Sequence, residues 1–212
     1  MGTPKRRLVT FGCSITYGHG LSDCITNNQE PGDVPSEFSW PAVLSQSLDL
    51  ELVNQGECGA SNHKILCNIL QYNFKPDDIV VIMWTFPDRD LIYGKKNFFT
   101  GKQAVSSIGI WVDDELATNW KATHSAEDNS TKTWFHLHHS YLHLKLLNLK
   151  SYNFIVDYDM IKRYKPKFIN VPLHNIKVSK LNVDFALDNM HPGPQTHKNI
   201  AEKIKDITLK CK

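Results

Sequence analysis

The chain has 212 residues, of which 41% are hydrophobic and 22% charged, with a formal net charge of +2. These values fit one globular domain spanning residues 1–212 and give no electrostatic reason to expect a nucleic acid or a membrane as partner. The longest apolar run covers residues 79–84, far short of a membrane-spanning helix. No apolar signal-peptide segment follows the basic N-terminus, so we expect a cytoplasmic protein whose five cysteines are reduced.

The first predicted strand spans residues 7–12, because the sequence LVTF at 8–11 is an almost uninterrupted apolar run. Gly12 then lets the backbone turn without a steric penalty. Ser14 follows just beyond the strand end, where open α/β sheets bind their ligands. A serine at such a place is a candidate nucleophile if a histidine can reach it. Residues 13–37 are expected to form a long loop beside the same site.

Strands and helices alternate through the first half of the chain, which predicts a parallel sheet with helices on both sides. The expected fold class is therefore α/β, a three-layer αβα domain with a mainly parallel sheet of about five strands. Its next elements are a helix from Ser39 to about Asp49, a strand at 51–54, a helix from about Ser61 to Asn73 and a strand at 78–84.

The second half of the chain has weaker patterns. Residues 107–112 are interpreted as a short strand or hairpin arm, residues 113–131 as a polar loop, and residues 134–150 as a long helix. Residues 152–157 fit either a fourth strand or a helix that continues to Tyr164. The last strand is predicted at 167–171 and a closing helix at 194–210.

A carboxylate and a histidine lie three residues apart near the end of the chain, at Asp188 and His191. In a loop or a single turn this spacing lets Asp188 accept a hydrogen bond from Nδ1 of His191 and fix its tautomer. Nε2 is then available to take the proton of Ser14. The three residues therefore form a candidate catalytic triad.

Three sequence blocks of this chain resemble those of the SGNH (GDSL) hydrolases. The block G-D-S-x-x-x-G corresponds to residues 12–18, with Cys13 in place of Asp, the block N-x-G-x-x-G-x-[ST] to residues 54–61, and the block D-x-x-H-P to residues 188–192. The third block, G-x-N-D, is not intact, and Pro87 lies near the position of its Asn. The resemblance implies a flavodoxin-like SGNH arrangement and supports Ser14, Asp188 and His191 as the catalytic residues.

The resemblance also implies an oxyanion hole made of the backbone N–H groups of Ser14 and Gly59. Its third donor in the family is an Asn side chain, which Pro87 cannot replace because proline has neither a side-chain donor nor an N–H. The Thr85 hydroxyl and the Arg89 guanidinium are alternative donors, and the Asn62 side chain, just past the second block, is a further candidate. We expect Thr85 to complete the hole.

Three further side chains are candidates for contact with the substrate. Arg89 would favour an anionic substrate, since a guanidinium binds a carboxylate or phosphate in a bidentate manner. Phe86 is a candidate because it follows the third predicted strand, and Asn62 because it follows the second block.

The function that this pattern favours is a serine esterase acting on a small-molecule or glycan ester, such as an O-acetyl group on a glycan. No metal or organic cofactor is implied, and the sequence leaves the oligomeric state open. One alternative is an inactive protein that has kept the fold for binding or for a structural role. A second alternative is a thioesterase or lysophospholipase with the same triad. The Lys- and Asn-rich composition is compatible with a phage-encoded protein.

Two other groups of residues have both a functional and a structural interpretation. Cys13 and Cys58 flank the predicted site and form either a redox-sensitive pair or two partly buried thiols. The histidines of the long predicted helix offer a metal site or, more simply, a solvated face. They are His136, His138, His139 and His143.

Overall fold

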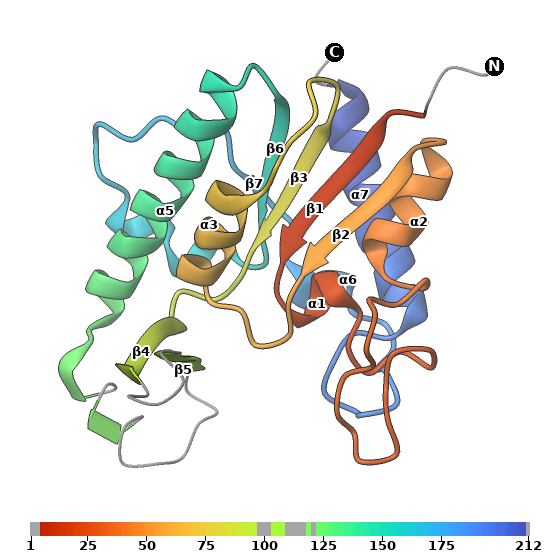
Figure 1. Ribbon diagram of the computed structural model, residues 1–212, viewed down its shortest axis with the longest axis horizontal. Helices are drawn as coiled ribbons and strands as arrows, with labels where there is room; N and C mark the ends of the chain where they lie inside the picture. The colour runs from red at the N-terminus through yellow and green to blue at the C-terminus, as the bar shows by residue number, and fades with distance from the viewer. Residues whose placement is uncertain (1–4, 97–102, 109–117, 120–121, 211–212) are drawn as a thin grey trace.

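A five-stranded parallel sheet forms the centre of the computed structural model, which describes residues 5–96, 103–108, 118–119 and 122–210. Its strands follow the order β2-β1-β3-β6-β7 (Figure 1). The two central strands β1 and β3 are buried almost throughout, as expected for apolar strands covered on both faces. The bounds are β1 Arg7–Gly12, β2 Glu51–Gly56, β3 Ile79–Trp84, β6 Lys150–Ile155 and β7 His174–Asn175.

Two pairs of helices cover the two faces of this sheet (Figure 1). Helix α2 (Trp40–Ser47) packs with α7 (Pro194–Lys210), and α3 (Asn62–Gln71) packs with α5 (Ala126–Leu146). The result is the three-layer αβα arrangement with five parallel strands that the sequence predicts. The smaller elements are α1 Ser14–Tyr17, α6 Val178–Leu181, the 3-10 turns Tyr158–Met160 and Lys162–Tyr164, and an antiparallel hairpin of β4 Asp90–Lys96 and β5 Gln103–Ile108.

The start of helix α5 corrects the predicted boundary. Residues 126–131 were expected in a loop, but the helix already begins at Ala126. Ser125 and Asp128 form a capping box. Ser125 Oγ accepts the Asp128 N–H at 3.0 Å, and Asp128 Oδ2 accepts the Ser125 N–H at 3.4 Å. This cap satisfies free N–H groups of the first turn and extends the helix into a polar segment that has little apolar periodicity.

The last strand of the sheet also differs from the prediction. Residues 167–171 are not a strand, and the fifth strand is the two-residue β7. Ile169 and Val171 are nevertheless buried, so their alternation reflects anchoring of a loop in the core. Pro166 and Pro172 flank this segment and cannot donate to a strand ladder.

Two segments of the second half had ambiguous predictions. Residues 152–157 belong mainly to strand β6, which pairs with β3 and ends at Ile155. Residues 107 and 108 end the hairpin strand β5, whereas residues 109–112 of the same prediction lie outside the described part of the chain.

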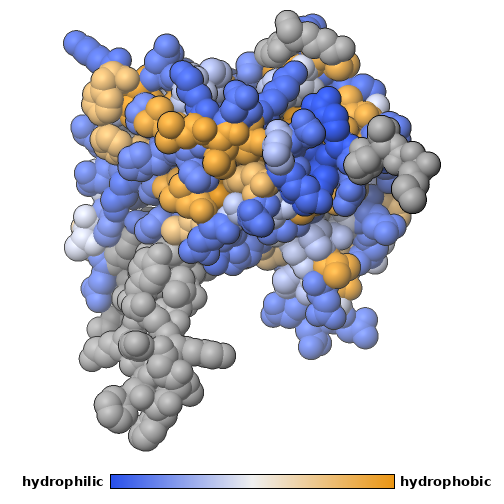
Figure 2. Space-filling model, turned by 45° about the horizontal axis from the view of Figure 1, so that its top comes forward, coloured by the Kyte–Doolittle hydropathy of each residue, from blue (hydrophilic) through white to orange (hydrophobic). Residues whose placement is uncertain are grey.

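Apolar side chains interrupt a mainly hydrophilic surface at the end of the molecule where the strands begin (Figure 2). Leu146, the last residue of α5, is an exposed apolar residue with 86% of its surface accessible. Within the described residues, no helix has both the length and the apolar composition needed to cross a membrane.

A buried histidine links the two helices that pack on one face of the sheet. His197 of α7 is fully buried, and its Nδ1 accepts the Trp40 N–H at 3.0 Å in the first turn of α2. Burial lowers the pKa of His197 to about 4. The folded protein therefore keeps this imidazole neutral at pH values where an exposed histidine is charged.

We predict that the free energy of unfolding falls as the pH is lowered from about 6.5 to about 4. In this window the unfolded chain binds a proton at His197 that the folded protein does not bind, so the loss is complete below about pH 4 and amounts to about 3 kcal/mol. His197→Asn keeps an acceptor for Trp40 and should reduce this pH dependence in urea titrations. The exposed His139→Asn is the control and should leave the dependence unchanged.

Candidate active site

Ser14 lies where the central strand β1 ends, as the first residue of the short helix α1. Gly12 permits this sharp turn, because a Cβ at that position would lie 2.0 Å from Thr16 Oγ1. The end of β2 fixes α1 from the other side, since Asn54 Nδ2 donates to Thr16 O at 2.8 Å. Gly56 approaches the same helix closely, and a Cβ there would lie 2.6 Å from the Tyr17 nitrogen. Ser14 is thus held by backbone packing on both sides.

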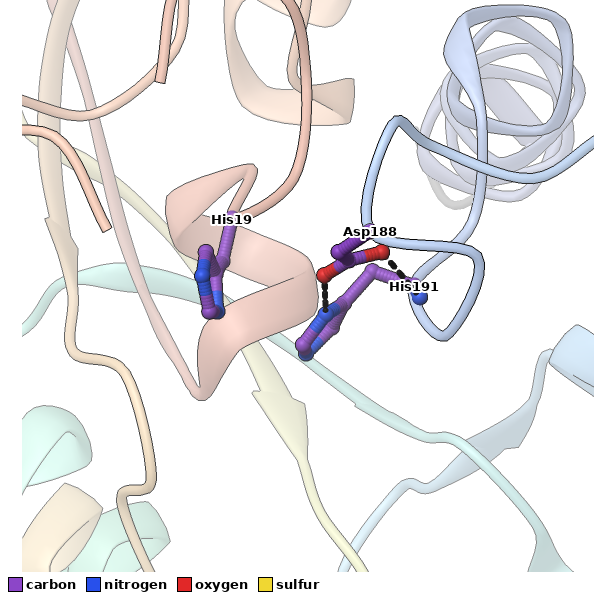
Figure 3. A group of neighbouring side chains, drawn as sticks. All are labelled: His19, Asp188 and His191. Carbon is purple, nitrogen blue, oxygen red and sulfur yellow. Dashed lines mark hydrogen bonds and ion pairs between the residues drawn. The ribbon is translucent and has the colours of Figure 1, made fainter. Parts of the chain in front are cut away.

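Asp188 and His191 come from the loop before helix α7 and meet Ser14 across the end of the sheet. His191 Nε2 lies 2.9 Å from Ser14 Oγ, and His191 Nδ1 lies 2.5 Å from Asp188 Oδ2. The backbone N–H groups of Met190 and His191 donate to Asp188 Oδ1 at 2.9 and 3.0 Å. Figure 3 shows the two hydrogen bonds between Asp188 and His191. The three residues that the sequence predicts as a triad therefore form a continuous chain of hydrogen bonds.

The charge state of Asp188 follows from two opposing effects. Burial raises the pKa of this carboxyl, whose side chain has no exposed surface. The hydrogen bonds from the His191 and Met190 backbone and from the His191 ring outweigh burial and hold the pKa below its usual value. Asp188 is therefore ionised at neutral pH and favours an Nδ1–H tautomer of His191, which leaves the Nε2 lone pair facing Ser14.

The loop after α1 lies beside the site, as the sequence predicts, but the contacts of its His19 and Gly20 with His191 and Asp188 were not predicted. The Leu187 N–H donates to the Gly20 carbonyl at 2.9 Å, and a Cβ on Gly20 would lie 2.7 Å from Asp188 Oδ2. The neighbouring His19 places its ring centroid 4.6 Å from that of His191 (Figure 3). The glycines at 18 and 20 were the only local signal, since both adopt positive φ angles.

A cavity of about 290 Å³ opens beside Ser14 and His191. Phe86 and Arg89, two predicted substrate contacts, line it, with the Arg89 guanidinium carbon 5.3 Å from the centre of the Phe86 ring. The other lining residues combine apolar side chains with a few polar groups. They are Ile15, Val156, Asp157, Val178, Ser179, Asn182, Met190 and Pro192.

Gly59 lies at the same edge of the sheet, after strand β2. It has a φ of +75° and open space where a side chain would be. Among the described residues, its N–H has no hydrogen-bond acceptor.

Thr85 and Asn62 occupy a different position from the one expected of them. Neither lines the cavity beside Ser14, and both are buried. Asn62 uses its amide within the protein: Oδ1 accepts the Thr85 N–H at 2.8 Å, and Nδ2 donates to Thr85 O and Thr133 Oγ1, each at 3.1 Å. The Thr85 hydroxyl has no partner among the described residues. Asn62 therefore fixes the chain after β3 rather than facing a substrate.

No family model and no curated protein matches the sequence of this chain. Solved structures match its fold. A member of the lipolytic protein G-D-S-L family from Veillonella parvula superposes with a TM-score of 0.50 at 16% identity, covering 97% of this chain and 99% of the other. A carbohydrate acetylesterase family member from Sinorhizobium meliloti gives 0.56 at 9% identity, with coverages of 97% and 98%. The acetyl xylan esterase Est2A from Butyrivibrio proteoclasticus gives 0.57 at 14% identity, with coverages of 99% and 64%.

The chain has the SGNH hydrolase fold. The predicted flavodoxin-like SGNH arrangement is therefore confirmed. Identities of this size establish the fold alone, so the roles of the site residues rest on the geometry described above.

The cysteine pair and the histidines of α5 are the remaining candidates from the sequence. Cys13 and Cys58 are free thiols, and burial raises the pKa of Cys58 to about 12, which disfavours a reactive thiolate. On α5, His136 stacks on His63 at 5.2 Å, and burial lowers its pKa to about 4. Among the described residues, the group with metal-ligand spacing is His19, Asp188 and His191, and the α5 histidines do not form one.

We predict that Gly20→Ala disrupts the Asp188–His191 hydrogen bond without unfolding the protein. The new methyl group would meet the Asp188 carboxylate, and the φ of +88° is unfavourable for alanine. The downfield ¹H NMR signal of His191 Nδ1–H should shift or broaden, while the circular dichroism spectrum is retained. Gly32→Ala, in the same loop but without positive φ, is the control. An unaltered downfield signal in Gly20→Ala would show that Gly20 does not position Asp188.

Proposed function

We propose that this protein is a serine-dependent ester hydrolase. The observation that carries the proposal is the hydrogen-bonded series Ser14–His191–Asp188 beside an open cavity. A nucleophile within 2.9 Å of a base, itself oriented by a buried carboxylate, is the arrangement that acyl transfer requires. The SGNH hydrolase fold, shared with esterases among its structural neighbours, supports the same reaction class.

In the proposed reaction, Ser14 Oγ attacks the ester carbonyl carbon while His191 Nε2 takes the hydroxyl proton. The resulting oxyanion is stabilised by the N–H groups of Ser14 and Gly59, and Asp188 stabilises the transient imidazolium of His191. His191 then gives its proton to the leaving alcohol, and the carbon–oxygen bond to that alcohol breaks. Water attacks the acyl-enzyme with His191 again as base, which releases the acid and restores Ser14.

The substrate class we propose is a short acyl ester, such as an O-acetyl group on a glycan. Apolar side chains next to Ser14, among them Ile15 and Val178, fit a small acyl group. Polar side chains such as Ser179 and Asn182 line the same cavity and can bind hydroxyl groups. The names of two structural neighbours, an acetyl xylan esterase and a carbohydrate acetylesterase family member, agree with this class.

One observation favours a second function, the binding of a glycan ester without rapid turnover. Pro87 stands near the position of the Asn donor of the family's third block, and the nearby Asn62 is fully hydrogen-bonded elsewhere. The proposed oxyanion hole therefore relies on two backbone donors. Loss of a single donor typically lowers kcat by about 10²–10³-fold, so a slow or inactive protein is a coherent alternative.

We predict that a fluorophosphonate probe labels Ser14 and no other serine. The nearby His191 Nε2 activates this hydroxyl, so Ser14→Ala should abolish labelling while the thermal unfolding temperature changes little. Ser179→Ala, another serine lining the cavity, is the matched control and should be labelled like the unaltered protein. The label is located by mass spectrometry of the digested protein. A folded sample that is not labelled at Ser14 would favour the binding protein over the enzyme.

We predict that Arg89 selects for negatively charged substrates. Arg89→Lys removes the bidentate fork but keeps the charge, so kcat/KM should fall about tenfold for a succinyl ester and much less for an acetyl ester. Arg163→Lys is the matched control, because Arg163 also lies over an aromatic ring, at 5.6 Å from Tyr164, but does not line the cavity. Equal losses on both esters would show that Arg89 has only a structural role.

A further inference from the structure

A second histidine lies beside the triad and has no part in the proposed hydrolysis. The ligating atoms of His19, Asp188 and His191 all lie within 4.8 Å of one another (Figure 3). His19 comes from the loop after α1, whereas Asp188 and His191 come from the loop before α7. Two imidazoles and one carboxylate thus converge from two segments that are far apart in sequence.

Both segments are held in place without any ligand. His19 Nε2 lies 3.0 Å from the carbonyl oxygen of Gln29, and the next residue, Gly20, accepts the Leu187 N–H at 2.9 Å. A carbonyl oxygen can only accept, so Nε2 of His19 carries the hydrogen, and Nδ1 of the neutral ring keeps its lone pair. The ring of His19, whose centroid lies 4.6 Å from that of His191, is therefore held next to the Asp188–His191 pair with little further ordering required.

We propose that these three side chains bind a zinc ion and that the ion switches the esterase off. Zinc is commonly held by two histidine nitrogens and a carboxylate oxygen at about 2.0–2.2 Å, with water as the fourth ligand of the tetrahedron. Magnesium prefers a nearly complete shell of oxygen ligands, so the same group discriminates against it. The inhibitory part of this inference rests on the proposed function.

Zinc binding is incompatible with the proton position that hydrolysis needs. In the active arrangement His191 Nδ1–H donates to Asp188 Oδ2 at 2.5 Å. When zinc bonds to Nδ1 and Oδ2, the Nδ1–H bond breaks and that proton leaves to solvent, while Nε2 takes a proton from solvent, so His191 stays neutral. Nε2 then carries a hydrogen and cannot accept the proton of Ser14, which stops the first step.

The inhibition test measures hydrolysis of p-nitrophenyl acetate at buffered concentrations of free zinc. Activity should fall at micromolar zinc and return on addition of EDTA, whereas millimolar magnesium should have no effect. The activity of each variant without zinc is measured first and taken as its own reference, and His19→Gln should require at least about tenfold more zinc for half inhibition, the scale of losing one contact at a metal site. His139→Gln, an exposed histidine of α5, should behave like the unaltered protein. Equal zinc sensitivity of His19→Gln and the unaltered protein would overturn the inference.

A binding test separates this inference from the esterase itself. Competition with a chromophoric chelator measures the zinc affinity of Ser14→Ala, which has no nucleophile. We expect one zinc ion per chain, and adding His19→Gln to this variant should lower the zinc affinity at least about tenfold. If Ser14→Ala binds no zinc, or binds it independently of His19, the metal site is refuted even if the protein is an esterase. If zinc binds through His19 but the unaltered protein hydrolyses no ester, the metal site stands and its inhibitory role falls with the proposed function.

Discussion

At Gly12, Gly20 and Gly56 the chain passes so close to a neighbouring segment that no side chain fits between them. The contact at Gly12 joins the adjacent elements β1 and α1, whereas those at Gly20 and Gly56 join segments remote in sequence: the loop after α1 with Asp188, and the end of β2 with α1. Because closely packed segments have few alternative positions, these contacts help to fix Ser14 and Asp188 in place.

The electrostatics of the site depend on a buried carboxylate that remains charged. Removing Asp188 from water is costly, and two backbone N–H groups together with the His191 ring compensate for it. In the proposed hydrolysis this carboxylate fixes the tautomer of His191, and in the proposed zinc site it is a ligand beside His19. In that proposal a proton and a zinc ion compete for one position between Asp188 and His191, so a borderline cation inhibits the reaction.

The substituted third block changes how the site is supported rather than where it lies. Asn62 binds both backbone groups of Thr85 and so fixes the chain that leaves β3, the segment from which Phe86 and Arg89 reach the cavity. The Asn62 side-chain amide, a candidate donor for the oxyanion hole, instead positions the segment that lines the cavity. The proposed oxyanion hole then consists of backbone groups alone, and the preference for anionic substrates that we predict depends on the charge of Arg89, which a neutral Asn would not provide.

The sequence by itself determined the alternation of strands and helices and a sheet of about five strands, because these follow from local apolar periodicity. Its short motifs with fixed spacing indicated Ser14, Asp188 and His191 as a candidate triad. It did not determine the start of α5, where a capping box extends the helix, or the last strand, where buried Ile169 and Val171 resemble a strand without pairing as one. Only the tertiary structure decided that His19 lies beside His191 and that the Asn62 side chain hydrogen-bonds the Thr85 backbone. Both depend on contacts between segments separated by more than twenty residues, and no local pattern records which side chains such contacts bring together.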